Sequence, residues 1–189
     1  MKKNKNYVLV LASGGIDSTA CINFYKNLQF EIEALFIDYG QLSKKKELDA
    51  ITSIAEYYKI NLIKIRVINN RKYRDGLILG RNAFLCFVAL INFRKENGII
   101  AIGIHSGTNY YDCSEKFSKQ IQTLFDGYSQ GTIKIGIPFL NFNKKEICDY
   151  CNFEKVPIYL SYSCELGEIQ PCGNCSTCKD LQVIYASKK

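Results

Sequence analysis

Two short stretches of this sequence contain residue types that can do chemistry. The first, residues 13–19, reads Ser-Gly-Gly-Ile-Asp-Ser-Thr and separates two apolar runs near the start of the chain. The second lies between residues 164 and 178 and contains four cysteines, each separated from the next by two to seven residues. The first pattern is typical of an anion-binding site, and the second is typical of a metal site.

The first stretch combines small residues with the start of an expected helix. Gly14 and Gly15 have no side chains, so their backbone N–H groups can approach an anion closely. Ser18 or Thr19 would begin the helix, whose free N–H groups and dipole favour phosphate. Asp17 would not bind phosphate, so we expect it to hold Mg²⁺ or to fix the loop. A glycine-rich turn with an ordinary helix cap is the alternative interpretation.

The same stretch differs from the two commonest nucleotide-binding loops. It lacks the lysine of the G-x-x-x-x-G-K-[ST] loop and the third glycine of the G-x-G-x-x-G pattern. It still falls between a first strand and a first helix, where the ligands of open α/β sheets bind. We therefore expect a phosphate-bearing ligand held by a different type of loop.

The four C-terminal cysteines follow the spacing C-x7-C-x2-C-x2-C. Four thiolates favour tetrahedral zinc in a closed, structural site. An iron–sulfur cluster and free reactive thiols are the alternatives. The candidate ligands are Cys164, Cys172, Cys175 and Cys178.

The remaining cysteines call for a different interpretation. The chain has nine cysteines in all, and an odd number argues against a disulfide framework. Cys148 and Cys151 form another C-x-x-C pair, but they fall within an expected helix. We interpret them as core thiols on one helical face.

Strand and helix signals alternate along the chain. We expect strands at residues 7–11, 32–38, 61–68, 99–104 and 132–137, and helices at residues 18–28, 43–58, 82–96, 114–126 and 143–151. Ser43 and Ser114 are the candidate caps of two of these helices. Repeated units of this length predict an α/β fold, a parallel sheet with helices on both faces. We expect one α/β domain over residues 1–160 and a small metal-binding segment over residues 161–189 that packs on it.

The end of the second expected strand, Asp38-Tyr39-Gly40, would lie beside the glycine-rich loop. Its backbone could read an adenine ring, and Asp38 could contact a ribose. A strand end followed by an ordinary turn is the alternative.

Composition and charge narrow the class of protein. The chain is 47% hydrophobic and 23% charged, as in ordinary globular proteins. Its net charge is +7, but the basic residues are scattered, which favours a lysine-rich surface over a dedicated nucleic-acid site. No apolar run reaches the ~18 residues that span a bilayer, and the basic start lacks the features of a signal peptide. We therefore expect a cytoplasmic protein with no membrane partner.

The S-G-G-x-D-S-T string resembles the pyrophosphate loop of the PP-loop ATP pyrophosphatases. Further motifs follow it in an order that resembles the QueC family of 7-cyano-7-deazaguanine synthases, and together they cover almost the whole chain. These motifs are Asp38-Tyr39-Gly40-Gln41, Gly80-Arg81-Asn82, Asp112-Cys113, Lys144 to Ile147, and Cys164 with Cys172-Gly173-Asn174-Cys175-Ser176-Thr177-Cys178.

The resemblance implies a reaction and a fold. ATP would activate the carboxylate of 7-carboxy-7-deazaguanine, ammonia would give the amide, and a second activation would dehydrate the amide to the nitrile. The implied fold is the Rossmann-like adenine nucleotide α-hydrolase type with a C-terminal zinc knuckle, and the implied cofactors are ATP, Mg²⁺ and Zn²⁺. The implied ATP-binding residues are Ser13, Gly14, Gly15, Asp17, Ser18, Thr19, Asp38, Tyr39 and Gly40.

The resemblance also assigns roles at the reacting end. Asp17, Ser18 and Lys144 are the implied catalytic residues, with Lys144 neutralising phosphate; a solvated lysine is the alternative. The implied substrate-binding residues are Arg81, Asn82, His105 and Asp112.

Three of these substrate-binding assignments have alternatives. Asp112 would accept N–H groups from a guanine-like edge, or it could cap the helix that begins near Ser114. Arg81 could instead form a surface ion pair. His105, the only histidine, could move a proton.

Three segments depart from the pattern of the family, and all lie on the substrate side. Residues 69–79 form only a short link, residues 103–112 are also shortened, and Lys179-Asp180 replaces arginines. Two further hypotheses therefore stay open. A more open pocket could pass an activated deazapurine carboxylate to an amine of a protein, DNA or RNA, or the chain could be a non-catalytic zinc-knuckle nucleic-acid binder. The sequence also leaves the oligomeric state open, a homodimer included.

Overall fold

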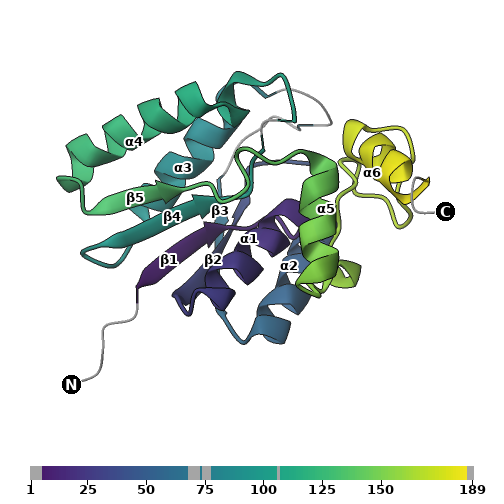
Figure 1. Cartoon of the computed structure of the whole chain (residues 1–189), viewed down its shortest axis with the longest axis horizontal. Coiled ribbons are helices and arrows are strands. Elements are labelled where there is room, and N and C mark those ends of the chain that lie inside the picture. The colour runs from purple at the N-terminus through teal and green to yellow at the C-terminus, as the bar shows by residue number, and fades with distance from the viewer. Residues whose placement is uncertain (1–5, 68–72, 74–77, 106, 187–189) are drawn as a thin grey trace.

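The computed structural model describes residues 6–67, 73, 78–105 and 107–186. Five strands form one sheet in the order β3-β2-β1-β4-β5, and every neighbouring pair is parallel (Figure 1). This arrangement confirms the predicted parallel α/β fold. The strands are β1 (Tyr7–Leu11), β2 (Glu31–Asp38), β3 (Asn61–Arg66), β4 (Gly98–Ile102) and β5 (Ile133–Gly136).

Helices cover both faces of the sheet. On one face, α1 (Ile16–Asn27), α2 (Lys44–Tyr58) and α5 (Lys144–Phe153) pack together, while α3 (Arg81–Ile91) and α4 (Glu115–Ser129) cover the other (Figure 1). Short 3-10 turns occur at η1 (Tyr111–Cys113) and η2 (Ile158–Leu160), and a last helix, α6, spans Ser176–Ala186. Among the residues that the structure describes, each helix is too short or too polar to cross a bilayer.

The central strand β1 joins the two cores. All five of its residues are buried. Because successive side chains of a strand point to opposite faces, Val8 and Val10 enter the core under α1 and α2, whereas Leu9 and Leu11 enter the core under α3 and α4. The rigid centre of the sheet therefore lies directly below the loop that leaves β1.

The strand order creates a natural ligand position. β1 has β2 on one side and β4 on the other, so the chain leaves β1 and β4 toward opposite sides. In open α/β sheets the crevice at such a switch point, outside the carboxyl ends of the strands, is where ligands bind. Residues 13–19 and 103–112 both begin at this crevice.

Two helices differ from the sequence-based expectation. The helix expected over residues 82–96 ends at Ile91, because the Asn92 side chain donates to the Val88 carbonyl at 2.8 Å and Phe93 turns away to pack on the Tyr7 ring. Ser43 occupies the cap position of α2 but does not cap it, since its hydroxyl donates to the Glu47 carboxylate instead. The last residue of the strand expected over 61–68 lies outside the described residues.

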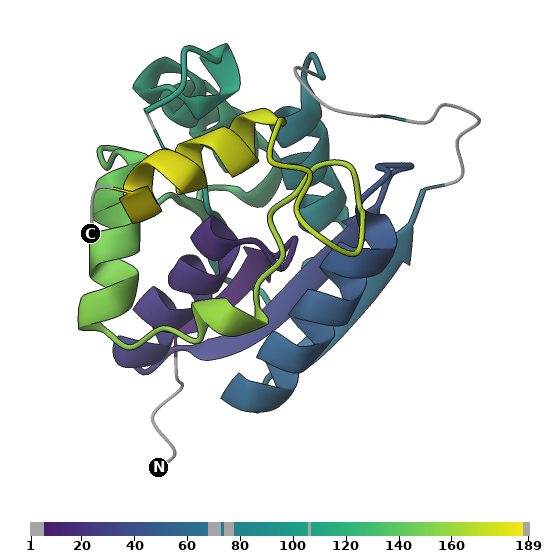
Figure 2. The ribbon, with the colours of Figure 1, turned by 90° about the vertical axis from the view of Figure 1, so that its right-hand side faces the viewer.

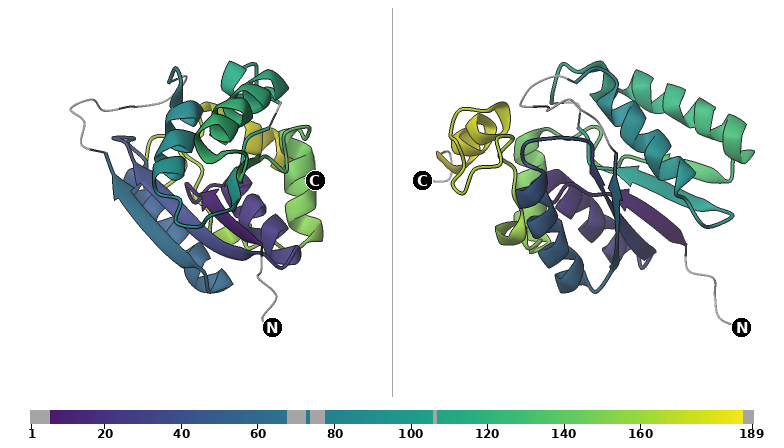
Figure 3. Two further views of the ribbon diagram at one scale, coloured as in Figure 1. Left: turned by 90° about the vertical axis from the view of Figure 1, so that its left-hand side faces the viewer. Right: turned by 180° about the vertical axis from the view of Figure 1, so that it is seen from behind.

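The C-terminal segment holds a helix that the sequence analysis did not predict. Helix α6 begins after Cys175 and contains the last of the four cysteines, Cys178, and it lies across the carboxyl ends of the strands (Figures 2 and 3). The segment is joined directly to the glycine-rich loop, because the Tyr162 N–H donates to the Gly14 carbonyl at 2.9 Å. Leu181 of α6 packs against the core beneath α1.

The cap of α4 provides a test of the fold. The Ser114 hydroxyl accepts the Phe117 N–H at 3.2 Å, as the sequence predicted. We expect Ser114→Ala to lower the free energy of unfolding by ~1 kcal/mol, because a helix N–H loses its partner. Urea denaturation would measure this change in the free energy of unfolding. The matched control is Ser118→Ala, one turn further along the helix, which should have no such cost; equal losses in both variants would contradict the capping role.

Candidate functional site

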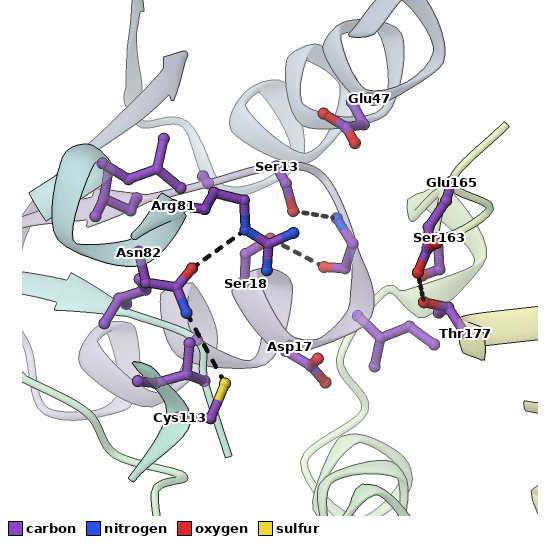
Figure 4. Close-up of a pocket in the computed structure, with 18 of the residues that line it drawn as sticks. Ser13, Asp17, Ser18, Glu47, Arg81, Asn82, Cys113, Ser163, Glu165 and Thr177 are labelled. Carbon is purple, nitrogen blue, oxygen red and sulfur yellow. Dashed lines mark hydrogen bonds between the residues drawn. The ribbon is translucent and has the colours of Figure 1, made fainter. Parts of the chain in front are cut away.

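A cavity of about 320 Å³ lies at the switch point of the sheet. Its walls come from the loop after β1, the end of β2, the start of α3, the end of β4, the start of α5 and the C-terminal segment. Figure 4 shows side chains from these elements converging on one space. The cavity therefore brings together segments from the two ends of the chain, from Leu11 to Asp180.

The glycine-rich loop is shaped by its backbone. Gly14 has a φ of +77°, and a Cβ there would lie 2.7 Å from the backbone oxygen of Glu47, so only glycine fits. The Gly15 carbonyl accepts the hydroxyls of Ser18 at 3.0 Å and Thr19 at 2.8 Å. The first N–H groups of α1 have no partner within the helix and are available to an anion.

The loop residues divide into two groups. Ser13, Gly15, Asp17 and Ser18 line the cavity. Gly14 and Thr19 do not, and Thr19 is fully buried. The structure thus brings four of the six loop residues expected to bind ATP together at the cavity, and the other two lie behind them.

A short ion pair joins the loop to α5. Lys144 Nζ lies 2.5 Å from Asp17 Oδ1, and both side chains are largely buried. The two residues are 127 positions apart in the sequence, so only the fold brings them together. This contact supports pairing the K-x-E-I motif with the S-G-G-x-D-S motif. Asn143 and Glu146 form a reciprocal capping box that fixes the start of α5, and with it the base of the lysine.

Gly103 determines where Asp17 sits. It follows β4, and a Cβ on it would lie 2.7 Å from the backbone carbon and oxygen of Asp17 and 2.9 Å from the Ser18 nitrogen. The end of β4 and the first turn of α1 therefore touch backbone to backbone.

The start of α3 is tied to η1 by buried hydrogen bonds. The Asn82 N–H donates to Asp112 Oδ2 at 3.2 Å, and the Asn82 side chain donates to the Asp112 carbonyl at 3.1 Å. Asp112 therefore caps α3, whereas Ser114 caps α4. The alternative interpretation of Asp112 was a cap of the helix that begins near Ser114. Asp112 instead caps α3. Asn82, Asp112 and the neighbouring Cys113 all line the cavity.

Arg81 extends across the cavity. Its guanidinium reaches from α3 toward Ser13 and Ser18, and its Nε donates to Asn82 Oδ1 at 3.4 Å (Figure 4). It also contacts the Tyr39 hydroxyl, and this contact partly offsets the rise that burial causes in the Tyr39 pKa. A cation is thus placed beside the glycine-rich loop.

Glu47 is a cavity residue that the sequence analysis missed. Its carboxylate accepts the Ser43 hydroxyl at 2.6 Å and the Gln41 side-chain N–H at 2.9 Å. Burial raises the pKa of Glu47 in spite of these bonds and of the charge of Arg81. Glu47 lies in the first turn of the helix that follows the D-Y-G-Q motif, and this position in the sequence could have indicated that it reaches the cavity.

Besides Gly14 and Thr19, two more residues expected to bind ATP, Asp38 and Gly40, lie outside the cavity. Asp38 accepts the Gly40 N–H at 3.0 Å and pairs with Lys44 at 3.3 Å and Arg66 at 3.7 Å. These contacts tie the end of β2 to its surroundings, and neither Asp38 nor Gly40 lines the cavity, whereas Tyr39 does.

The C-terminal segment supplies a wall that the sequence analysis also missed. Glu165 accepts the hydroxyls of Ser176 at 2.8 Å and Thr177 at 3.2 Å, which joins the two halves of the cysteine segment (Figure 4). The cysteines were interpreted for metal binding, and the polar residues within and beside their segment were given no role at the site. Those that line the cavity are Ser163, Glu165, Ser176, Thr177 and Asp180.

The cysteine cluster has the geometry of a metal site. The sulfurs of Cys164, Cys172, Cys175 and Cys178 all lie within 4.8 Å of one another. Tetrahedral zinc with Zn–S bonds of about 2.3 Å needs sulfurs about 3.8 Å apart, so the four residues fit the ion. Burial raises the pKa of Cys164, but N–H groups of Cys172 and Leu166 donate to its sulfur and bring the value down to about 7.

The other cysteines occupy the core. Cys148 and Cys151 are buried on α5, as predicted, and none of the nine cysteines is joined in a disulfide within the described residues. Burial raises the pKa of Cys151 to about 12, which keeps it protonated near neutral pH.

His105 lies at the cavity end of β4. Its ring lines the cavity, and burial, together with Lys144, lowers the pKa of the imidazole. It is therefore placed with the phosphate-loop residues rather than on the surface.

Comparison with known proteins identifies relatives over nearly the whole chain. A family profile described as "Queuosine biosynthesis protein QueC" matches residues 7–74 and 66–187. A 7-cyano-7-deazaguanine synthase of Prochlorococcus marinus subsp. pastoris (strain CCMP1986 / NIES-2087 / MED4) is 30% identical over 213 positions, which cover 97% of this chain and 94% of the relative. A 7-cyano-7-deazaguanine synthase 2 of Desulfitobacterium hafniense (strain Y51) is 31% identical over 198 positions, covering 90% and 84%.

A solved structure shares the fold. The predicted subunit of tRNA methyltransferase from Methanocaldococcus jannaschii superposes with a TM-score of 0.52 at 15% identity, over 78% of this chain and 74% of the other. This likeness concerns the architecture alone.

Gly103→Ala tests the backbone contact at the site. We expect it to lower the free energy of unfolding by about 1–3 kcal/mol and to weaken binding of inorganic pyrophosphate, because the new methyl group displaces Asp17 and Ser18. Urea denaturation and calorimetric titration would measure the two effects. The control is Gly127→Ala in α4, where a Cβ meets nothing within 4 Å. Unchanged pyrophosphate affinity in Gly103→Ala would contradict the positioning role.

Metal content tests the cysteine cluster. We expect one zinc per chain by elemental analysis, and its loss in Cys175→Ser, because three sulfurs no longer close the tetrahedron. Cys86→Ala, which alters a buried thiol away from the cluster, should keep the metal. A folded wild-type protein without metal, or with iron and sulfide, would contradict the zinc assignment.

Proposed function

The chain belongs to the QueC family, and we propose that it acts within that family as a cytoplasmic ATP-dependent carbon–nitrogen ligase on 7-carboxy-7-deazaguanine. It would activate the carboxylate with ATP, form the amide with ammonia and convert the amide to the nitrile, 7-cyano-7-deazaguanine. AMP and pyrophosphate would be released at each activation.

The observation that carries this proposal is the single cavity at the switch point. It holds an anion-binding helix start, a buried lysine–aspartate pair and a guanidinium on one side, and hydrogen-bonding groups for a polar ring on the other. A reaction that joins ATP to a carboxylate needs these two halves beside each other, since the reacting atoms must meet at about 3–3.5 Å.

In the first half-reaction, a carboxylate oxygen of the substrate attacks the α-phosphorus of ATP. The bond to the bridging oxygen breaks, and pyrophosphate leaves with the electron pair. The first N–H groups of α1, with Ser13 and Ser18, would hold the departing pyrophosphate. Lys144 and Arg81 would neutralise the charge that develops there, as preorganised donors do in other transfer reactions.

Asp17 would act with Mg²⁺ rather than on phosphate directly. Lys144 contacts its Oδ1, which leaves Oδ2 for the ion, and carboxylate oxygens are the ligands that Mg²⁺ prefers. When bound, the ion would screen charge between the phosphates. The ion pair with Lys144 would therefore orient the Asp17 carboxylate toward the Mg²⁺ ion.

In the second half-reaction, the nitrogen of ammonia bonds to the acyl carbon and AMP departs. Asn82 and Asp112 would face the deazaguanine, with the free oxygen of Asp112 accepting ring N–H groups. Zinc would keep the wall that carries Glu165 and Thr177 folded against the loop, a structural role outside the chemistry.

A second candidate acceptor rests on a specific observation. The family profile matches in two parts that meet at residues 66–74, and an alignment of 213 positions is longer than this chain of 189 residues. Segments of the relatives are therefore missing here, and residues 69–79 precede α3, whose first residues line the cavity. We infer that a chain shortened at this point would admit an amine carried by a protein, DNA or RNA in place of ammonia.

One assay distinguishes the acceptors. Zinc-loaded protein is incubated with ATP, Mg²⁺, 7-carboxy-7-deazaguanine and ammonia, and products are followed by mass spectrometry. Nitrile supports the proposed reaction. Adenylate or amide that accumulates without nitrile supports a macromolecular amine. No turnover of ATP with any acceptor would overturn both, and the non-catalytic nucleic-acid binder would then be the remaining hypothesis.

Variants of the loop test the site within that assay. We expect Asp17→Ala and Ser13→Ala to abolish ATP cleavage while zinc content stays at the wild-type level, because both residues face the phosphates and neither touches the cysteines. Asp149→Ala is the control, since that residue pairs with Lys145 on the exposed side of α5. Full activity in Asp17→Ala would contradict the assignment.

A further inference from the structure

His105 is the one histidine of the chain, and its ring forms part of the cavity wall. From the sequence alone it is a candidate for moving a proton. The contacts of its two ring nitrogens decide whether it can do so, because a neutral imidazole has one nitrogen that donates and one that accepts.

The Nδ1 atom of His105 already accepts a hydrogen bond. The Gly107 N–H donates to it at 3.2 Å. Since this bond uses the lone pair of Nδ1, the neutral ring must carry its proton on Nε2. The remaining nitrogen is then a donor and has no lone pair with which to accept a proton.

Gly107 makes this contact possible. A Cβ at that position would lie 2.9 Å from Nδ1 and 3.2 Å from Cε1 of the imidazole. Any larger residue would push its own N–H away from the ring. The short turn therefore fixes both the orientation and the tautomer of His105.

Burial is the main influence that keeps the imidazole of His105 neutral. Burial is the largest influence and lowers the pKa of His105; Lys144 of α5 lowers it further, while Asp17 of α1 and Asp180 of α6 act in the opposite direction. The charge of Asp17 is largely balanced by Lys144 at 2.5 Å. Near neutral pH the ring is therefore uncharged.

His105 lies at the same end of the cavity as the start of α1. Gly103, two residues before His105, contacts the backbone of Asp17 and Ser18 in the first turn of α1. His105 is accordingly on the side of the helix start and of Lys144.

We propose that His105 is a hydrogen-bond donor to a phosphoryl oxygen of ATP, through Nε2–H, and does not act as a proton acceptor; the inference rests on the proposed function. In the activation step the new carboxyl O–P bond forms, the bond to pyrophosphate breaks, and the donor stabilises the oxygen charge without losing its proton. In the amide-forming step, the proton that nitrogen loses passes to the AMP phosphate or to water.

Nitrogen NMR of the zinc-loaded protein tests the tautomer directly. With a single histidine, the ¹⁵N-labelled imidazole gives unambiguous signals. We expect an unprotonated Nδ1 and a protonated Nε2 at pH 7 and above, and a mixture of tautomers in Gly107→Ala. A wild-type ring that is charged at pH 7, or that carries its proton on Nδ1, would overturn the inference.

The same spectra separate failure of this inference from failure of the proposed function. Adding a non-hydrolysable ATP analogue with an intact triphosphate, with Mg²⁺, should shift the Nε2–H proton together with backbone signals of residues 13–18. Shifts in the loop alone would overturn the role of His105 and keep nucleotide binding. No shift anywhere would overturn both.

Matched substitutions give the functional readout. Glutamine places an N–H near Nε2, whereas asparagine places one near Nδ1. We expect His105→Asn to lower kcat by about 100-fold, as loss of one transition-state donor does, and His105→Gln to remain within about tenfold of wild type. The pH profile of His105→Gln should keep the wild-type shape. An acidic limb that is present in the pH profile of the wild-type protein and absent in that of His105→Gln would show that the imidazole accepts a proton. This result would overturn the proposal.

Discussion

The site depends on backbone placed against backbone at two glycines. Gly14 lets the loop after β1 lie on the backbone of α2, and Gly103 lets the end of β4 touch the first turn of α1. The C-terminal segment meets the same loop, where the Tyr162 N–H donates to the Gly14 carbonyl. The N–H groups at the start of α1 are thus aimed by rigid elements, so they would need little reorganisation to bind an anion.

The charged groups around this frame are held by partners. Lys144 pairs with Asp17, the charge of Arg81 acts on the half-buried Glu47, and the backbone N–H of Asn82 donates to the Asp112 carboxylate. Each contact stabilises a group that would be costly to bury alone. The cysteine segment completes the enclosure, so the proposed metal site lies beside the proposed nucleotide site and would have a structural role there.

The sequence predicted the parts of this site that local pattern controls. The glycine-rich loop, the four sulfurs and the parallel sheet follow from spacing and periodicity, and the structure confirms the sheet and the clustering of the sulfurs. The sequence predicted less well which residues from distant parts of the chain meet at the cavity. Asp38 resembles a ribose ligand in sequence but pairs with Lys44 and Arg66, while Glu47 and Glu165 reach the cavity only because α2 and the cysteine segment fold back onto the loop.

Transfer of oxygen from the substrate to AMP tests the central claim most directly. The substrate 7-carboxy-7-deazaguanine is prepared with ¹⁸O in its carboxylate and incubated with the zinc-loaded protein, ATP, Mg²⁺ and ammonia. If the cavity joins that carboxylate to the α-phosphorus, AMP recovered from the reaction carries one ¹⁸O by mass spectrometry, whichever amine accepts the acyl group. AMP free of ¹⁸O, or ADP as the nucleotide product, would contradict the account.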